Sequence, residues 1–370
     1  MRLGLLNEQN ALERRVALVP EAVAKLTAKG FQVVIECNAG TGAYWPDEAY
    51  RQAGAEVLPT AQAVVETCEI LLRLRMPTPE EIEGYPSGRV LVGLLQAWQH
   101  PESLAALAEK QWSIFGLERL PRLTRAQSMD VLSSMAALAG YKAVLLAAYH
   151  FERVFPMLTT AAGTLAPARV LVIGAGVAGL QAIATARRLG AQVEAYDIRP
   201  AAKEQVESLG ARFLPLTLDA NAETAGGYAR ALTPEEQARQ QEALAAYLAR
   251  ADIVITTAAL PERPAPKIIT RTMRQQMKPG TVIVDLAADT GGNCEETIPG
   301  QTQNLDGVLL LAPLQLPATL PVHASQMLSR NFSEFLSLFC AKNSPPRLHT
   351  DDELLQKTCI LWKGTKELVA

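Results

Sequence analysis

Short apolar runs alternate with helix-like segments along the first third of the chain. We predict strands at Leu3–Leu6, Phe31–Glu36, Ile70–Leu74, Val90–Leu95 and Trp112–Leu117. The clearest helix between them covers residues 20–28, where Pro20 suits a first turn and Gly30 a stop. Strands that alternate with helices favour a parallel sheet with both faces covered.

A second series of the same kind follows one long helical segment. Residues 130–151 contain few helix breakers and carry apolar side chains at helical spacing, which predicts a helix that bridges two domains. Further strands are predicted at Val170–Ile173, Gln192–Tyr196, Arg212–Leu214, Ile253–Thr256, Val282–Leu286 and Gly307–Leu311.

Two segments late in the chain differ from this alternation. Residues 216–233 show no usable periodicity and predict a long mobile loop, after which Thr233, Pro234 and Glu236 predict a capped helix start. A helix at 324–338 and an edge strand at 359–362 are expected to return the tail to the first domain.

These patterns predict an α/β fold of two Rossmann-like domains with parallel sheets, joined by long helices, with an NAD cleft between them. A chain of 370 residues exceeds the length at which one core stops growing, so two domains are expected. We place the first in residues 1–129 plus 319–370 and the second in 130–318.

Composition excludes several classes of protein. A net charge of −3 offers no field to attract polyanions, so nucleic acid is not an expected partner. The five cysteines form no CxxC pair, which fits a reducing compartment and argues against a metal site. The longest uninterrupted apolar stretches, such as 143–148, fall short of the ~20 residues that cross a bilayer, so we expect a soluble chain without direct membrane insertion.

A glycine-rich turn follows the first strand of the second series. It reads Gly174-Ala-Gly-Val-Ala-Gly179 and leads into a helical segment. Gly174 would permit the tight turn, Gly176 would leave room for a pyrophosphate, and Gly179 would let helix and strand pack closely. Asp197 lies 18 residues beyond Gly179, near the spacing at which a carboxylate meets the adenosine ribose. A glycine turn without a ligand is the alternative, and this context favours a dinucleotide.

The residues after the second strand bear on the choice of cofactor. An acid at Asp197 would repel a 2′-phosphate, which favours NAD(H) over NADP(H). Arg199 complicates this preference because an arginine can serve a 2′-phosphate; its alternative role is a surface residue paired with a nearby carboxylate.

Longer motifs carry a resemblance to a known family. They are 14–17, 121–130 with 133–134, 139–141, 174–179, 203–210, 226–229, 284–288 and 291–295. On these motifs, which span nearly the whole chain, it resembles the soluble NAD(H)-binding alpha subunit, domain I, of proton-translocating NAD(P) transhydrogenase, a relative of alanine dehydrogenase.

The resemblance implies two groups of site residues. The loop that holds the nicotinamide and its ribose would contain Arg122, Gln127, Ser128, Met129, Asp130 and Ser133, and Tyr228 would tip a mobile loop over bound nucleotide. The pyrophosphate and adenosine would contact Gly174, Ala175, Gly176, Val177, Gly179, Asp197, Ile198, Arg199, Gly227, Gln240 and Ala259.

Two observations limit these assignments. The family usually has leucine at Ala259 and Ile-Pro-Gly at 260–262, so the packing on the adenine stays open here. Without the resemblance, residues 122–133 are a polar stretch before a helix that Asp130 or Ser128 caps.

The residue types in the first domain bear on the chemistry. Reducing an imine or keto acid moves a proton with the hydride, so such enzymes need an acid or base near the reacting carbon. The resemblance places the lysine and histidine of alanine-oxidising relatives at Arg75 and Gln96, neither of which exchanges a proton near neutral pH. Hydride exchange between two nicotinamides needs no such group, only positioning.

The resemblance therefore predicts half of an enzyme, an Re/Si-specific, proton-translocating NAD(P)+ transhydrogenase that is active only with partner subunits. The chain would bind NAD(H) and exchange hydride with NADP(H) on a separate subunit. It would form a homodimer, cytoplasmic and peripheral on the inner face of the bacterial membrane through membrane-spanning partners. The alternatives are a soluble alanine-type dehydrogenase with Arg15 gripping a carboxylate, and a non-catalytic NAD-binding regulatory module.

Overall fold

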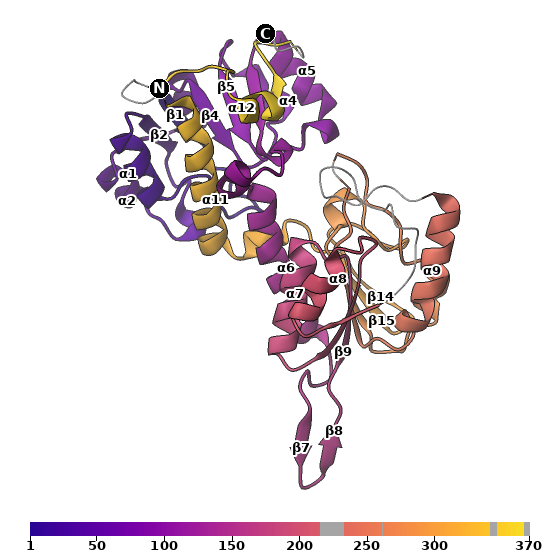
Figure 1. Cartoon of the computed structure of the whole chain (residues 1–370). Helices are drawn as coiled ribbons and strands as arrows, with labels where there is room; N and C mark the ends of the chain where they lie inside the picture. Colours follow the sequence, from indigo (N-terminus) through magenta and orange to yellow (C-terminus); the bar gives the residue numbers. More distant parts are fainter. Residues whose placement is uncertain (215–232, 261, 341–345, 366–370) are drawn as a thin grey trace. The chain divides into compact units, whose positions relative to one another are not determined.

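The computed structural model describes residues 1–214, 233–260, 262–340 and 346–365, and it contains two compact units (Figure 1). Unit 1 comprises Met1–Met135 and Ala318–Ala370, and unit 2 comprises Ala136–Pro317. The first and last segments of the chain therefore fold together in unit 1.

Unit 1 is built on a seven-stranded sheet with the order β16-β6-β5-β4-β1-β2-β3. The strands are β1 (Arg2–Leu5), β2 (Gln32–Glu36), β3 (Ala55–Leu58), β4 (Ile70–Arg73), β5 (Val90–Gly93), β6 (Ser113–Gly116) and β16 (Cys359–Leu361). Strands β1 to β6 are parallel and follow the Rossmann order 3-2-1 then 4-5-6. The expected edge strand β16 is present but antiparallel to β6, so the sheet is not wholly parallel.

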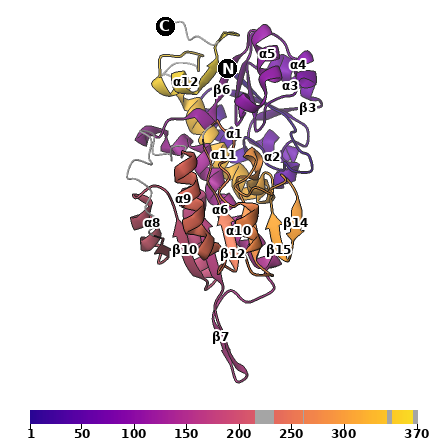
Figure 2. The ribbon, with the colours of Figure 1, turned by 90° about the vertical axis from the view of Figure 1, so that its right-hand side faces the viewer.

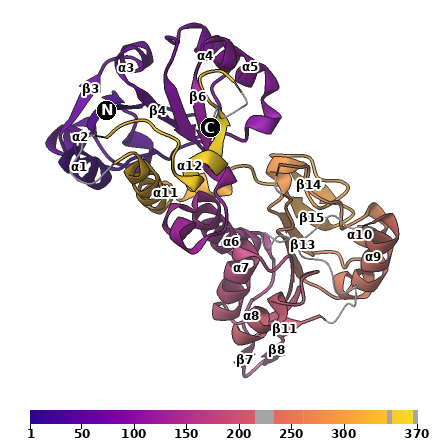
Figure 3. The same cartoon turned by 45° about the horizontal axis from the view of Figure 1, so that its top comes forward.

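The C-terminal helix α11 completes the core of unit 1. The helices are α1 (Pro20–Ala28), α2 (Asp47–Gln52), α3 (Ala61–Thr67), α4 (Pro79–Glu83), α5 (Pro101–Glu109), α11 (Pro321–Leu336) and α12 (Glu353–Thr358). Figure 3 shows α11 beside α1, with which it is in contact. Buried hydroxyls on α11 accept backbone hydrogen bonds from the segment before α1, Val16 N to Ser325 Oγ (3.0 Å) and Val19 N to Ser329 Oγ (2.7 Å).

Unit 2 repeats this architecture in a second seven-stranded sheet, β11-β10-β9-β12-β13-β15-β14. The strands are β9 (Arg169–Ile173), β10 (Gln192–Tyr196), β11 (Arg212–Phe213), β12 (Ile253–Thr256), β13 (Val282–Asp285), β14 (Thr302–Leu305) and β15 (Val308–Leu311). Strand β14 was not predicted, and it pairs antiparallel with β15 at the edge. It is polar and half exposed, so it lacks the apolar run that marks a buried strand.

Alternate residues of β9 enter two different cores. Val170 and Val172 pack with α6 (Val131–His150), α7 (Val177–Arg188) and α8 (Ala202–Ser208). Leu171 and Ile173 pack with α9 (Pro234–Leu248) and α10 (Arg271–Gln275), which lie together on the opposite face (Figure 2). Helix α9 has the predicted capping box, in which Glu236 N donates to Thr233 Oγ1 at 3.3 Å and Thr233 N to Glu236 Oε2 at 2.8 Å.

Helix α6 is long and apolar enough, with a mean hydropathy of 1.6, to cross a membrane by length and composition alone. Core helices of soluble proteins meet the same test, and Ala143, Val144 and Ala147 of α6 lie in the core of unit 2. The sequence prediction rested on uninterrupted apolar runs, whereas the folded helix gathers apolar residues over 20 positions. A Cβ at Gly140 of α6 would lie 2.0 Å from Ala178 O, so the glycine permits close contact with α7.

A two-stranded hairpin that the sequence pattern did not predict projects from unit 2 (Figures 1 and 2). Strands β7 (Leu158–Thr160) and β8 (Gly163–Leu165) pair only with each other in the described part of the chain, and all their residues are exposed. Each strand has three residues, too few to show an alternating pattern in the sequence.

Candidate nucleotide-binding site

The glycine turn lies between β9 and α7, at the carboxyl end of the strand. Gly174 adopts a φ of +96°, a conformation that favours glycine, and its N–H donates to Tyr196 O at 2.8 Å. A Cβ at Gly179 would lie 1.8 Å from Gly174 O, whereas a Cβ at Gly176 would meet no described atom within 4 Å. The three glycines therefore have the conformational roles predicted: a tight turn, an open space and a close contact.

Helix α7 begins at the open space. Gly176 is its N-cap, and no side chain of the described residues caps the helix there. The first-turn N–H groups of a helix lack intrahelical partners and attract anions, so this end of α7 can accept a phosphate. Val177 is 38% exposed beside it, an apolar side chain available to a ligand. The residues present thus fit a dinucleotide pyrophosphate.

The acid at the end of β10 is tied to both the glycine turn and an arginine. Asp197 Oδ2 accepts from Ala175 N at 2.7 Å, so the carboxylate contacts the second residue of the turn. Arg199 forms a two-point ion pair with it, Nε to Oδ1 and Nη2 to Oδ2, both at 2.9 Å. The Asp197 side chain is only 7% exposed as a result. An adenosine ribose would have to share or displace the guanidinium to reach this carboxylate.

The turn after β12 forms the next wall. Thr257 Oγ1 donates to Gly174 O at 2.9 Å, and Ala259 is exposed at the same carboxyl edge. Strands β9 and β12 are neighbours at the position where the strand order reverses, which is where open α/β sheets bind ligands. The sequence interpretation missed Thr257 because a threonine after a strand is unremarkable until the strand order is known.

Gln240 has a different position from the other predicted adenosine-side residues. Its side chain is buried in α9, and its Nε2 donates to Tyr196 Oη at 3.2 Å. Burial raises the pKa of Tyr196 to about 12, so the hydroxyl stays protonated at neutral pH. In this structure Gln240 supports the end of β10, the strand that carries Asp197 and Ile198.

The predicted nicotinamide-side residues belong to unit 1 and lie around a short 3-10 helix, η4 (Thr124–Met129). Arg122, Gln127 and Ser128 are exposed, and Met129 is buried. Asp130 accepts from Ser133 N at 2.8 Å and from Ser133 Oγ at 2.6 Å, so these two residues cap α6. The capping role that the residues alone allowed is therefore present.

The C-terminal segment holds η4 from two sides. Asn331 of α11 donates through Nδ2 to Ser128 O at 2.8 Å. Arg125 makes a two-point ion pair with Asp352, Nη1 to Oδ2 at 2.9 Å and Nη2 to Oδ1 at 2.6 Å. The Arg125 hydrogen bonds hold the pKa of Asp352 below its usual value. The return of the tail to unit 1 thus fixes the backbone that carries Gln127.

Two further predictions lie outside the described residues. Gly227 and Tyr228 both fall in 215–232, as does most of the loop predicted at 216–233. The site residues that the structure does describe form two sets, one in each unit.

The positions expected to hold an acid or base in an alanine-type enzyme are occupied otherwise. Arg75 makes two ion-pair contacts with Glu81, Nη2 to Oε1 at 2.7 Å and Nη1 to Oε2 at 3.0 Å. Burial opposes ionisation of Glu81, but the Arg75 hydrogen bonds and the Arg73 charge hold its pKa below the usual value. Arg15 is buried and paired with Glu13 at 2.6 Å.

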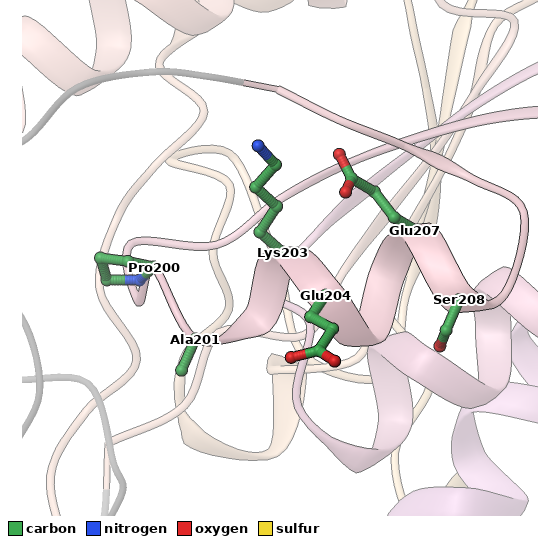
Figure 4. A pocket seen from close by; sticks show the side chains of 6 residues that line it. All are labelled: Pro200, Ala201, Lys203, Glu204, Glu207 and Ser208. Atoms are coloured by element: carbon green, nitrogen blue, oxygen red, sulfur yellow. The ribbon is translucent and has the colours of Figure 1, made fainter.

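No group of three or more His, Cys, Asp or Glu side chains among the described residues is placed to hold a metal ion. An open hollow does lie along α8, beyond Arg199. Its lining includes Lys203, Glu204 and Glu207, with Lys203 and Glu207 on one side of the helix and Glu204 on the other (Figure 4).

A Rossmann strand order with a glycine turn and a strand-end acid at its switch point defines a dinucleotide-binding protein. Residues 4–139 match the N-terminal domain of alanine dehydrogenase/PNT, and residues 143–367 match its C-terminal domain. The chain belongs to the alanine dehydrogenase/PNT family.

Similar proteins extend over the whole chain. It is 42% identical to the first section of the divided NAD(P) transhydrogenase subunit alpha of Rhodospirillum rubrum, over 98% of this chain and 97% of the relative. A crystal structure of transhydrogenase from Sinorhizobium meliloti is 41% identical, with a TM-score of 0.85 over 99% of this chain and 98% of that one. An L-alanine dehydrogenase structure is 28% identical, with a TM-score of 0.80 over 100% of this chain and 97% of that one.

Proposed function

We propose that this chain is the NAD(H)-binding subunit of a proton-translocating NAD(P) transhydrogenase. Unit 2 would hold the pyrophosphate at the glycine turn and the adenosine ribose at Asp197. Similarity to transhydrogenase alpha subunits at 42% identity over nearly the whole chain supports this assignment. The open space at Gly176 supports it independently, because it leaves room for a phosphate at a helix N-terminus.

The observation that carries the choice of reaction is the occupancy of positions 75 and 96. Arg75 is held by Glu81, and Gln96 does not titrate, so neither side chain provides a proton to a carbonyl or imine substrate. Exchange of a hydride between two nicotinamides needs no proton at the reacting carbons, and positioning of the rings contributes the rate. In this proposal Arg122, Gln127, Asp130, Ser133 and Tyr228 hold the nicotinamide and its ribose.

The proposed partners follow from the reaction and from the relatives' names. NADP(H) would be bound by a separate subunit, and membrane-spanning subunits would conduct the protons. The chain would then be cytoplasmic and peripheral on the inner face of the bacterial membrane. The name of the Rhodospirillum rubrum relative, which makes it one section of a subunit alpha, supports a multi-subunit assembly.

The test is a hydride-exchange assay. NADH is first titrated into the purified chain by calorimetry, and stopped-flow absorbance then follows exchange after mixing with an NADP+-loaded transhydrogenase partner subunit. We expect exchange with the partner and no NADH oxidation with pyruvate and ammonia. Turnover with pyruvate and ammonia would establish the alanine-type alternative. NADH binding without exchange would favour a regulatory module.

The hairpin of unit 2 supports the homodimer in this proposal. Leu158 and Leu165 are cross-strand partners on one face of the hairpin, 43% and 54% exposed, and the neighbouring Met157 is 65% exposed. A two-stranded hairpin is at best marginally stable alone in water, so an ordered one with an apolar face fits a contact with another chain. A second copy of this chain is the proposed partner.

A double variant Leu158→Ser/Leu165→Ser is therefore expected to weaken the dimer. Light scattering coupled to size exclusion should show a shift from dimer to monomer at micromolar concentration, with NADH affinity retained. The matched control Thr159→Ser/Thr164→Ser changes the opposite face of the hairpin, where the two hydroxyls lie 3.2 Å apart. A wild-type chain that is monomeric, or a leucine variant that stays dimeric, would refute the hairpin contact.

A further inference from the structure

The sequence motifs at 284–288 and 291–295 have no role in the site described above, yet they surround a fully buried acid. Asp285 ends β13 and is 0% exposed. Its Oδ2 accepts from Asn293 N at 2.8 Å, Cys294 N at 3.0 Å and Thr297 Oγ1 at 2.5 Å. Its Oδ1 accepts from Thr256 Oγ1 at 2.9 Å. The carboxylate therefore joins the chain after β13 to the end of β12.

Two glycines let the chain fold around this acid. Gly291 and Gly292 adopt φ values of +101° and +85°, which other residues rarely adopt. A Cβ at Gly292 would lie 2.6 Å from Asp285 Oδ2. The pair of glycines is thus required for the backbone N–H groups of residues 293 and 294 to reach the carboxylate.

The asparagine that follows contacts the wall of the nucleotide site. Asn293 is 0% exposed, and its side-chain amide pairs with both backbone groups of Ala258. Ala258 N donates to Asn293 Oδ1 at 3.0 Å, and Asn293 Nδ2 donates to Ala258 O at 2.8 Å and to Pro266 O at 2.9 Å. Every hydrogen-bonding position on this buried amide that the distances define is used on the turn after β12.

We infer that Asp285 and Asn293 are positioning residues that hold the 257–259 turn against the glycine turn, in the geometry that receives NAD(H). The path runs from Asp285 through Asn293 to Ala258, and from the adjacent Thr257 Oγ1 to Gly174 O at 2.9 Å. A Cβ at Gly174 would lie only 2.5 Å from Thr257 Oγ1, so the two turns are in direct contact. This inference rests on the proposed NAD(H) site and assigns a role to the 284–295 motif.

Three variants test it. Asn293→Ala removes the amide from Ala258, and Thr257→Val removes the last hydrogen bond of the path at a half-buried position without altering the buried asparagine. We expect calorimetry to show NADH binding weakened about tenfold by Asn293→Ala and severalfold by Thr257→Val, the scale of one to two lost hydrogen bonds. Thr257→Ser, which keeps the hydroxyl, should restore wild-type affinity.

The control separates positioning from stability. Arg274→Met removes a buried arginine of the same unit whose hydrogen bonds go to Glu296 at 2.9 and 3.0 Å and to Asp306 at 2.6 Å. It should lower the melting temperature and leave the Kd for NADH unchanged. Hydrogen exchange without nucleotide gives a second readout, since Asn293→Ala should speed exchange of the Ala258 amide and Arg274→Met should not.

The outcomes are distinct. Wild-type affinity in both Asn293→Ala and Thr257→Val, or equal weakening by Arg274→Met, would overturn the positioning role. If Asn293→Ala does not fold, the comparison of Thr257→Val with Thr257→Ser decides. If the wild-type chain does not bind NADH, the proposed function fails, and the exchange of the Ala258 amide still shows whether Asn293 holds this turn.

Discussion

A Gly176→Val variant is expected to fold normally and to bind NADH at least about 100-fold more weakly than wild type, a loss of about 2.7 kcal/mol. Gly176 has φ −75° and ψ −169°, an extended conformation that valine adopts without strain. A Cβ there meets no described atom within 4 Å, so the new side chain would fill the space in front of α7 rather than the core. Calorimetry and thermal unfolding measure the two effects separately.

The third glycine of the motif should fail in the opposite way. Gly179→Ala would place a Cβ 1.8 Å from Gly174 O, a contact that requires β9 and α7 to move apart. We expect a clear fall in melting temperature, with weak binding as a secondary result. A Gly176→Val variant that loses stability as Gly179→Ala does, or one that binds NADH with wild-type affinity, would contradict a phosphate position at the start of α7.

An Asp197→Asn variant is expected to change which cofactor binds. The amide oxygen still accepts from Ala175 N–H, but the charge that holds Arg199 is gone. The freed guanidinium and the nearby Lys203 on α8 then offer two cations to a 2′-phosphate. We expect NADH binding to weaken about tenfold and the ratio of the NADPH and NADH dissociation constants to shift about 100-fold towards NADPH.

The contribution of the arginine can be isolated in a double variant. Asp197→Asn/Arg199→Ala should lose the gain in NADPH binding while NADH binding stays weak. The single Lys203→Ala variant in the wild-type background should leave NADH affinity near normal, because the carboxylate still repels a 2′-phosphate. An Asp197→Asn chain that still rejects NADPH would show that Arg199 does not reach the 2′-position.

The local features of unit 2 could be predicted from sequence because each depends on neighbouring residues. The glycine turn requires a strand, three glycines and a helix within about one βα unit, and each glycine has a local steric reason. The capping box at Thr233 and Glu236 spans four residues and is present as predicted. The central strands are continuous apolar runs because both faces of a parallel sheet are covered.

The edges of the sheets could not be predicted in this way. Strand β14 and the hairpin β7–β8 are exposed, so burial imposes no hydrophobic pattern on them. Strand β3 was missed for the same reason, since it lies at the edge of its sheet and only Ala55 is buried. The antiparallel direction of β16 also depends on where the tail meets β6, which no local pattern encodes.

The sequence by itself determined the class of fold and the strand–turn–helix that faces the pyrophosphate, because these follow from steric rules acting over a few residues. Only the tertiary structure decided that Arg199 covers Asp197, that Gln240 turns towards Tyr196, and that Asn293 meets Ala258 from 35 positions away. These contacts depend on which strand ends lie side by side, and strand order is set by packing of the whole unit rather than by any local segment.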